Sequence, residues 1–175
     1  MKCPLLVAVI VLSLAGCSEK EPEKAPTPAA SPAAAPAPSF AKATTVRPAV
    51  IQSTRSLPNA CSFDAVNDQP PKDASISDKA RVKLHGWAGN VPAGTSPKQV
   101  FVEFEGPSKV YVQATHGIKR PDVADALKKP GLVDTGWVAY ADLSDAAAGA
   151  YKVRIIQVEV QSGLVCDSNK SIVIK

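Results

Sequence analysis

Two histidines and a pair of aspartates are the side chains of this sequence that could supply a catalytic base or a metal site. His85 and His116 fall in stretches of alternating apolar residues, which place them on predicted β-strands. A catalytic base needs a nearby nucleophile and an orienting carboxylate, and the sequence has no nucleophile-elbow, zincin or phosphate-loop motif. Asp122 and Asp125 lack the alternating oxygen ligands of a calcium loop, and helix capping explains both more simply. We therefore expect no catalytic residue, no metal and no cofactor.

Cys17 is the thiol with the most informative surroundings. Lys2 gives the chain a positive start, residues 5–14 form a short apolar run, and small residues precede the cysteine in Leu14-Ala15-Gly16-Cys17. This is the layout of a secretory signal peptide over residues 1–16, and its apolar run is too short to span a bilayer as a stable helix. The tetrad resembles the lipobox of bacterial lipoproteins. The alternative is an ordinary signal peptide with a chance cysteine.

The resemblance to bacterial lipoproteins implies a lipid anchor on Cys17. In that family the cysteine is alkylated by diacylglycerol, the leader is removed before it, and the new N-terminus is acylated, as by palmitate. Each buried methylene contributes about 0.8 kcal/mol and two acyl chains already anchor a protein stably, so the membrane is the first expected partner. Ser18, rather than an aspartate, follows the lipid site. This implies a place in the outer membrane of a bacterial cell envelope, facing the periplasm or the cell surface.

Cys61 and Cys166 are the thiols that remain once Cys3 departs with the leader and Cys17 carries lipid. Thiols of an exported chain are oxidised, so these two are predicted to form a disulfide between the first and last strands. Such a bridge closes a loop of about a hundred residues and is worth up to about 4.7 kcal/mol in the chain-entropy model. A metal or redox role is the weaker alternative, because the pair lacks a CxxC arrangement and nearby histidines.

Aromatic residues on predicted strands are the candidate ligand contacts. The four candidates are Trp87, Tyr111, Trp137 and Tyr140. Flat aromatic rings on a sheet face are a usual platform for sugar rings. The alternative, favoured for both tryptophans, is that they pack in the core. Phe101 and Tyr111 are expected to be exposed, as a cross-strand pair.

A disordered tether is expected to separate these residues from the lipid. Residues 17–57 are dominated by Pro, Ala, Lys, Glu, Ser and Thr, with Phe40 as the only aromatic residue. Such a segment cannot bury enough apolar surface to offset its ordering entropy. Its proline spacing favours a polyproline-like coil, which sets reach rather than recognition.

Residues 58–175 predict one all-β domain. Short apolar-alternating runs are separated by Gly, Pro, Asn and Asp, and about seven strands of this kind suit an immunoglobulin-like antiparallel sandwich. The predicted strands are 61–66, 81–87, 99–105, 109–115, 133–143, 151–161 and 164–174. Val100 and Phe104 share one parity and are expected to face the core, whereas Phe101 faces water. The strand after Tyr151 has apolar residues of both parities, which predicts a bulge or two-sided burial.

One short helix is predicted between the fourth and fifth of these strands. Pro121 suits the first helical position, Asp122 favours the positive end of the helix dipole, and Pro130-Gly131 ends the segment. Arg120 is expected to anchor the helix to Asp122 or to a strand carbonyl. We interpret Arg120, Pro121 and Asp122 as a structural motif.

Residues 60–175 also resemble a small β-sandwich module of bacterial envelope proteins. The resemblance is carried by Leu84-His85-Gly86-Trp87-Ala88, Arg120-Pro121-Asp122-Val123-Ala124, Gly136-Trp137, Asp142-Leu143-Ser144, Gly149-Ala150-Tyr151 and Cys166. Similar modules are attached to membrane glycosyltransferases for surface polysaccharides, which implies an accessory role near glycan assembly. The sequence shows neither their transmembrane catalytic portion nor an Asp-x-Asp nucleotide-sugar motif, so transferase activity is not carried over.

The expected function is therefore non-catalytic. The leading hypothesis is a binding or scaffold lipoprotein whose sandwich docks an envelope protein or polysaccharide. The second is a structural or surface lipoprotein with no specific ligand, and the third is an envelope enzyme with an unrecognised site. The formal net charge of +4 is mild and its charges are interspersed, which argues against nucleic acid as a partner. The sequence leaves the oligomeric state open.

Overall fold

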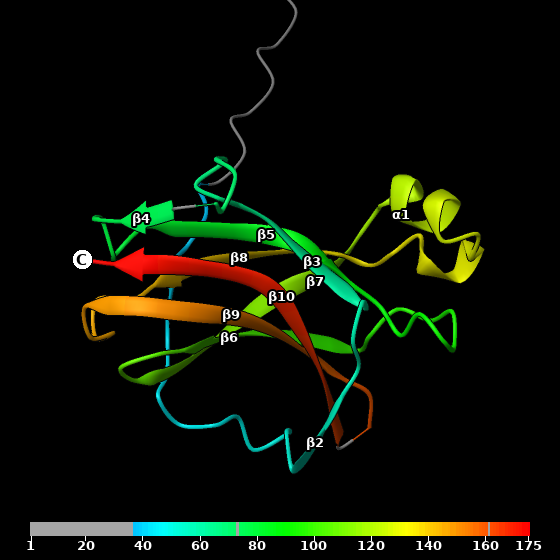
Figure 1. Cartoon of the computed structure of the whole chain (residues 1–175), viewed down its shortest axis with the longest axis horizontal. Coiled ribbons are helices and arrows are strands. Elements are labelled where there is room, and N and C mark those ends of the chain that lie inside the picture. The colour runs from blue at the N-terminus through cyan, green and yellow to red at the C-terminus, as the bar shows by residue number, and fades with distance from the viewer. Residues whose placement is uncertain (1–36, 73, 161) are drawn as a thin grey trace, which may run out of the picture. The chain divides into compact units, whose positions relative to one another are not determined.

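The described part of the chain is a sandwich of β-strands with one short α-helix, as predicted (Figure 1). This computed structural model describes residues 37–175, except residues 73 and 161. Its strands are β1 (Ala41–Lys42), β2 (Ser53–Ser56), β3 (Cys61–Val66), β4 (Ala74–Ile76), β5 (Val82–Ala88), β6 (Gln99–Glu105), β7 (Lys109–Ile118), β8 (Gly136–Asp142), β9 (Gly149–Val158) and β10 (Ser162–Ile174). Its helices are α1 (Pro121–Ala126) and the 3-10 helix η1 (Pro130–Leu132). The predicted signal peptide and Cys17 lie outside the described residues.

The sandwich has the strand order of an immunoglobulin constant domain. One sheet runs β3-β5-β8-β7 and the other β6-β9-β10, which correspond to the A-B-E-D and C-F-G sheets of that fold. β7 belongs to both sheets, because residues 109–114 pair with β6 whereas residues 115–118 pair with β8. The prediction of an immunoglobulin-like all-β sandwich is thereby confirmed for the seven antiparallel strands of these two sheets; β1, β2 and β4, which pair with them in parallel, were not predicted.

The inner core lies between the two sheets and follows the predicted alternation. Val100, Val102 and Phe104 of β6 point into it and are fully buried, as are Val82 and Leu84 of β5. The other large side chains of the inner core are Phe63, Ile76, Trp137, Leu143, Tyr151, Ile155, Ile172 and Ile174. Burial of apolar surface stabilises by about 25 cal/mol per Å², so this cluster is the main source of stability.

A second apolar cluster lies on the outer face of the β6-β9-β10 sheet. This outer cluster consists of Ile51, Phe101, Tyr111, Ile156 and Val158. The prediction that Phe101 and Tyr111 are exposed was wrong: they are 6% and 5% exposed, because an N-terminal segment covers them. Two-sided burial of β9 is confirmed, since Ile155 faces the inner core and Ile156 the outer cluster.

The segment that covers the outer cluster is a strap formed by residues 41–56, coloured blue to cyan in Figure 1. At one end β1 pairs in parallel with β8, and Thr44 exchanges backbone hydrogen bonds of 3.0 and 2.8 Å with Tyr111. Ile51 then packs into the outer cluster, and β2 pairs in parallel with the edge of β10. The strap belongs to the predicted linker of residues 17–57, so the folded part of the chain begins before the predicted boundary at residue 58.

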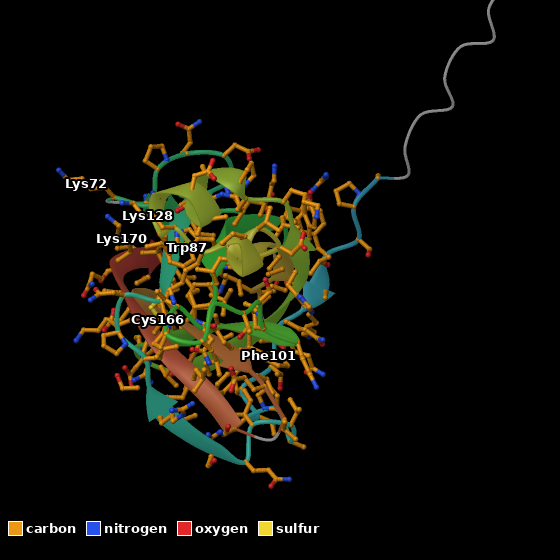
Figure 2. The ribbon with its side chains drawn as sticks, turned by 90° about the vertical axis from the view of Figure 1, so that its right-hand side faces the viewer. Lys72, Trp87, Phe101, Lys128, Cys166 and Lys170 are labelled. Atoms are coloured by element: carbon orange, nitrogen blue, oxygen red, sulfur yellow. A yellow bond between two sulfur atoms is a disulfide. The ribbon has the colours of Figure 1, made fainter. Side chains whose placement is uncertain are left out.

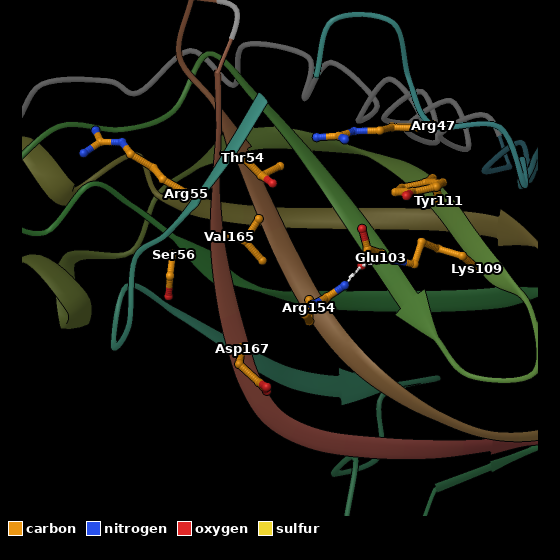
Figure 3. A pocket seen from close by; sticks show the side chains of 10 residues that line it. All are labelled: Arg47, Thr54, Arg55, Ser56, Glu103, Lys109, Tyr111, Arg154, Val165 and Asp167. Carbon is orange, nitrogen blue, oxygen red and sulfur yellow. Dashed lines mark hydrogen bonds and ion pairs between the residues drawn. The ribbon is translucent and has the colours of Figure 1, made fainter. Parts of the chain in front are cut away.

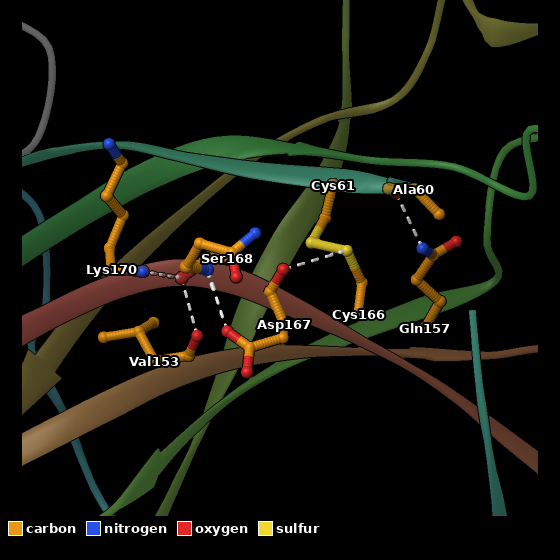
Figure 4. Close-up of a disulfide and its surroundings, with 9 residues drawn as sticks. Ala60, Cys61, Val153, Gln157, Cys166, Asp167, Ser168 and Lys170 are labelled. Atoms are coloured by element: carbon orange, nitrogen blue, oxygen red, sulfur yellow. Dashed lines mark hydrogen bonds between the residues drawn. A yellow bond between two sulfur atoms is a disulfide. The ribbon is translucent and has the colours of Figure 1, made fainter. Parts of the chain in front are cut away.

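Cys61 and Cys166 form the predicted disulfide, with 6.0 Å between their Cα atoms (Figure 4). It joins β3, at the edge of one sheet, to β10 of the other across a sequence separation of 105 residues. Beside it, the side-chain amide of Gln157 donates a hydrogen bond of 2.9 Å to the carbonyl of Ala60. These links fix the chain where it leaves the strap and enters the sandwich.

Candidate functional site

Two of the four aromatic residues predicted to contact a ligand are buried. Trp137 is 1% exposed and stacks on Phe63 in the inner core, with the ring centroids 6.3 Å apart. It fits against Gly86 of β5, where an added Cβ would come within 2.8 Å of the indole ring. Tyr111 lies in the outer cluster beneath the strap. Core packing therefore accounts for Trp137, and neither ring forms a platform on the surface.

Trp87 and Tyr140 are partly exposed on one face of the β3-β5-β8-β7 sheet, but they do not meet. Trp87 pairs with Gly136 and Tyr140 with Lys83, so four strand positions, about 13 Å, separate them. Phe40 also packs edge-on against Tyr140, with ring centroids 5.6 Å apart. Trp87 lies apart from Phe101 of the outer cluster as well (Figure 2). The four predicted aromatic residues thus share no single surface.

Arg120 anchors α1 in the way the sequence predicts. Its guanidinium donates hydrogen bonds of 2.9 and 2.8 Å to the carboxylate of Asp122, and one of 2.8 Å to Asp64 of β3. Pro121 is the first residue of the helix. The pKa of the Asp122 carboxyl is lowered chiefly because Arg120 donates to it. These contacts tie the helix to the sheet, which is a structural role.

The histidines lie on strands, His85 on β5 and His116 on β7. The Nε2 atom of His85 is 3.8 Å from a carboxylate oxygen of Asp68. Within residues 37–175, leaving aside 73 and 161, no three His, Cys, Asp or Glu side chains gather closely enough to hold a metal ion. In that same part of the chain, no helix has the length and apolar character needed to cross a membrane.

A polar pocket of about 400 Å³ opens beside the strap (Figure 3). We call it the Glu103 pocket; the residues that matter for its chemistry are Arg47, Thr54 and Ser56 of the strap and Glu103, Arg154 and Asp167 of the sheet. The side chain of Glu103 is only 7% exposed, although strand alternation predicts a water-facing residue. The sheet therefore carries a buried charge beside the apolar outer cluster.

An ion-pair network holds Glu103 in place. The Nε atom of Arg154 donates a hydrogen bond of 2.9 Å to Oε1 of Glu103, and Nζ of Lys109 lies 3.8 Å from the same oxygen. Arg154 also lies 3.1 Å from a carboxylate oxygen of Glu105. Two cations thus converge on one oxygen of Glu103, and the hydroxyl of Tyr111 is a further side-chain hydrogen-bond partner of this carboxylate.

Tyr111 pairs with Glu103 across β6 and β7 and lines the same pocket. The pKa of its hydroxyl is raised by burial, by the neighbouring charge of Glu103 and by a side-chain hydrogen bond to Glu103, whereas the charge of Arg47 acts in the opposite direction. Tyr111 therefore stays protonated at neutral pH and has a hydrogen to donate to the Glu103 carboxylate. Arg47 lines the same pocket.

The strap supplies the exposed polar groups of the pocket. Arg47, Thr54 and Ser56 are all exposed. Figure 3 shows Thr54 on the side facing Glu103, whereas Arg55 extends away from the Glu103–Arg154 pair. Among the described residues, no carboxylate forms an ion pair with Arg47. A ligand could reach these groups without displacing an internal ion pair.

This pocket was not predicted from the sequence. Its residues come from the strap, β6, β9 and β10, which only the sheet order and the strap bring together. One signal was present: Phe101 gives β6 an apolar residue on the parity that was expected to face water. A strand with apolar residues of both parities indicates that both faces are covered.

Comparisons with known proteins found no match to this chain. No model of a protein family matches it, and neither the curated proteins nor the solved structures gave a significant match. The resemblances to bacterial lipoproteins and to envelope sandwich modules therefore stay predictions.

Proposed function

We propose that this protein is a lipid-anchored lipoprotein of a bacterial cell envelope, whose sandwich binds an envelope partner without catalysing a reaction. Cys17 is the proposed site of the lipid, and the partner is a protein or a polysaccharide. The resemblance to modules of surface-polysaccharide glycosyltransferases favours a place near polysaccharide assembly. The resemblance to bacterial lipoproteins, in which a serine after the lipid site implies the outer membrane, favours an outer-membrane location because Ser18 follows Cys17.

The strap is the observation that carries this proposal. The chain that leads from the proposed lipid site enters the domain as residues 41–56 and forms one wall of the Glu103 pocket. That wall and the sheet offer hydroxyls, cations and carboxylates, which are the groups that orient a polar ligand. The lining of this pocket includes no histidine or cysteine, the residues that most often act as general base or activated nucleophile. The set of groups favours binding over catalysis.

The anchoring half of the proposal is tested with Cys17→Ala. The full chain should fractionate with membranes, and the variant should be released into the soluble envelope fraction, because it loses the acyl chains that hold it. Cys3→Ala is the matched control, since it changes a thiol of the leader and leaves the lipobox intact. Mass spectrometry of the mature N-terminus should show acylated Cys17, and membrane retention of Cys17→Ala would contradict the anchor.

The binding half is tested with the detergent-solubilised full chain on an array of bacterial surface polysaccharides. A photoreactive residue at position 54, inside the Glu103 pocket, adds a cross-linking assay in intact envelopes. Binding to a polysaccharide, or a defined envelope protein cross-linked from position 54 but not from position 175, supports the proposal. The absence of both favours the alternative, a structural lipoprotein with no specific ligand.

A further inference from the structure

We propose that the Glu103 pocket binds a sugar residue that carries a carboxylate, as a uronic acid does. Arg47 holds the sugar carboxylate, and Glu103 accepts hydrogen bonds from its hydroxyls. This inference rests on the proposed binding function and names the chemical class of its ligand.

The pocket holds positive charge that no described carboxylate pairs with. Arg154 and Lys109 are already engaged with Glu103 and Glu105. Arg47 has no such partner among the described residues, yet its charge acts on Tyr111 at the pocket. An exposed guanidinium with five donors suits a carboxylate, to which it can bind through two parallel hydrogen bonds.

The lining of the pocket carries more positive than negative charge. Its cations are Arg47, Arg55, Lys109 and Arg154 and its carboxylates are Glu103 and Asp167, of which Glu103 is already paired with Lys109 and Arg154. A sugar carboxylate adds a negative charge, which Arg47 balances. The charge of the lining therefore favours an anionic sugar over a neutral one.

The groups around Arg47 both accept and donate hydrogen bonds. Figure 3 shows one carboxylate oxygen of Glu103 directed away from Arg154, and a carboxylate has about four acceptor sites, so Glu103 can accept from a ligand as well as from Arg154 and Tyr111. Thr54 and Ser56 add hydroxyls that both donate and accept. A ligand with many hydroxyls satisfies this set, and a simple fatty or amino-acid carboxylate does not. The volume of about 400 Å³ lies within the range of ligand pockets.

A purely structural role explains the buried Glu103 less well. The positions around it, Phe101, Tyr111 and Ile156, form an apolar cluster under the strap. A buried ion pair is often matched or exceeded in stability by apolar side chains of similar volume. A charged pair beside this cluster, with one oxygen turned to an open pocket, therefore points to a ligand.

The experiment is a calorimetric titration of the detergent-solubilised full chain with trisaccharides of glucuronate, galacturonate and mannuronate. Each is paired with its methyl ester, which keeps every hydroxyl and removes the charge. We expect at least one acid to bind about tenfold more tightly than its ester, as a charge-assisted hydrogen bond provides. Raising the ionic strength should lower the affinity for the acid and leave the affinity for the ester unchanged, because salt screens exposed charges.

Two variants locate the contacts. Arg47→Gln should reduce the affinity for the acid about tenfold and leave the affinity for the ester unchanged. Glu103→Gln should reduce the affinity for both ligands. Lys42→Gln is the matched control, since it removes a positive charge from the same strap at a side chain that does not line the pocket. Its affinity should stay within about twofold of the parent.

Each outcome decides the proposal. Failure of all three acids to bind, equal binding of acid and ester, or equal losses of affinity in Arg47→Gln and Lys42→Gln would overturn it. If a neutral polysaccharide or an envelope protein binds instead, the ligand class is wrong and the binding function stands. If nothing binds in this experiment or in the tests of the binding function, then the binding function and the ligand class are both wrong.

Discussion

The two apolar clusters of this protein lie on opposite faces of one sheet, but they are covered in different ways. The inner core is closed by a whole second sheet and by the disulfide. The outer cluster is closed by a strap that is attached through the two residues of β1, Thr44, Ile51 and the four residues of β2. Every residue of β1 and β2 is exposed, so the strap is held by edge hydrogen bonds and a single deeply buried side chain.

This difference predicts where the domain opens first. Segments with few buried apolar contacts and exposed backbone hydrogen bonds unfold locally at a lower free energy than core strands. The strap is such a segment, whereas β6 from Val100 to Phe104 and β9 from Ile155 to Val158 are buried on both faces. Because the strap also forms a wall of the Glu103 pocket, the least stable part of the domain is the part that we propose to bind ligand.

Phe104 and Phe101 give the most direct test of this contrast, since they lie on one strand and face opposite clusters. Phe104 is fully buried in the inner core and packs edge-on against Tyr151, so Phe104→Ala should cost about 4 kcal/mol of unfolding free energy. Phe101→Ala should cost about half of that, because the strap can settle into the space it leaves. Urea denaturation measures both. Equal losses would show that the outer cluster is as rigid as the inner core.

The disulfide is the next largest effect, and it belongs to the inner sandwich rather than to the strap. Replacing Cys61 and Cys166 together by serine should destabilise the oxidised protein by about 3 kcal/mol, because the bridge closes a long loop in the unfolded chain. Thermal melts with and without reductant measure the change. The double variant should be insensitive to reductant, and a melting temperature equal to that of the oxidised parent would refute a stabilising bridge.

Ile51 tests the strap itself. Ile51→Ala removes its buried anchor, yet the global loss should be only about 1 kcal/mol, because the strap can detach while the sandwich stays folded. Hydrogen exchange should instead quicken strongly at the amides of Thr44 and Leu57, which donate to Tyr111 and Val165 at 3.0 and 2.8 Å. Ile155→Ala, in the inner core, is the matched control. Ile155→Ala should lower the free energy of global unfolding by more than Ile51→Ala does, and it should leave the Thr44 and Leu57 amides protected from hydrogen exchange.

Local sequence patterns predicted the sandwich because its strands carry their own signals. Cys61–Val66 and Gln99–Glu105 were predicted to the residue, and the disulfide followed from the two thiols outside the leader and the lipobox. The strand expected from residue 133 begins only at Gly136, because η1 and the turn after it occupy the residues before. Alternation and cysteine chemistry thus sufficed for the architecture.

The strap and the Glu103 pocket could not be predicted in the same way. β2 has the sequence Ser-Thr-Arg-Ser, with no apolar alternation, and it is a strand only because the edge of β10 pairs with it. Arg154 meets Glu103 through the register of β6 with β9, which sequence alone does not set. These features depend on tertiary contacts, so composition assigned residues 41–56 to a linker.

The smallest expected effect is a dependence on pH that again separates the sandwich from the strap. Hydrogen bonds from Arg120 lower the pKa of Asp122 below the usual value of about 3.9, so the folded protein binds this proton less tightly than the unfolded chain. The stability it contributes is therefore present above about pH 4 and is lost as pH falls through the lowered pKa. Asp122→Asn should flatten that part of the acid melting curve. Because Arg120 joins α1 to β3, this loss of stability should appear in global unfolding and not in faster hydrogen exchange at the Thr44 amide. Acid-induced exchange confined to the Thr44 amide would show instead that the contacts of the strap are the more sensitive to acid.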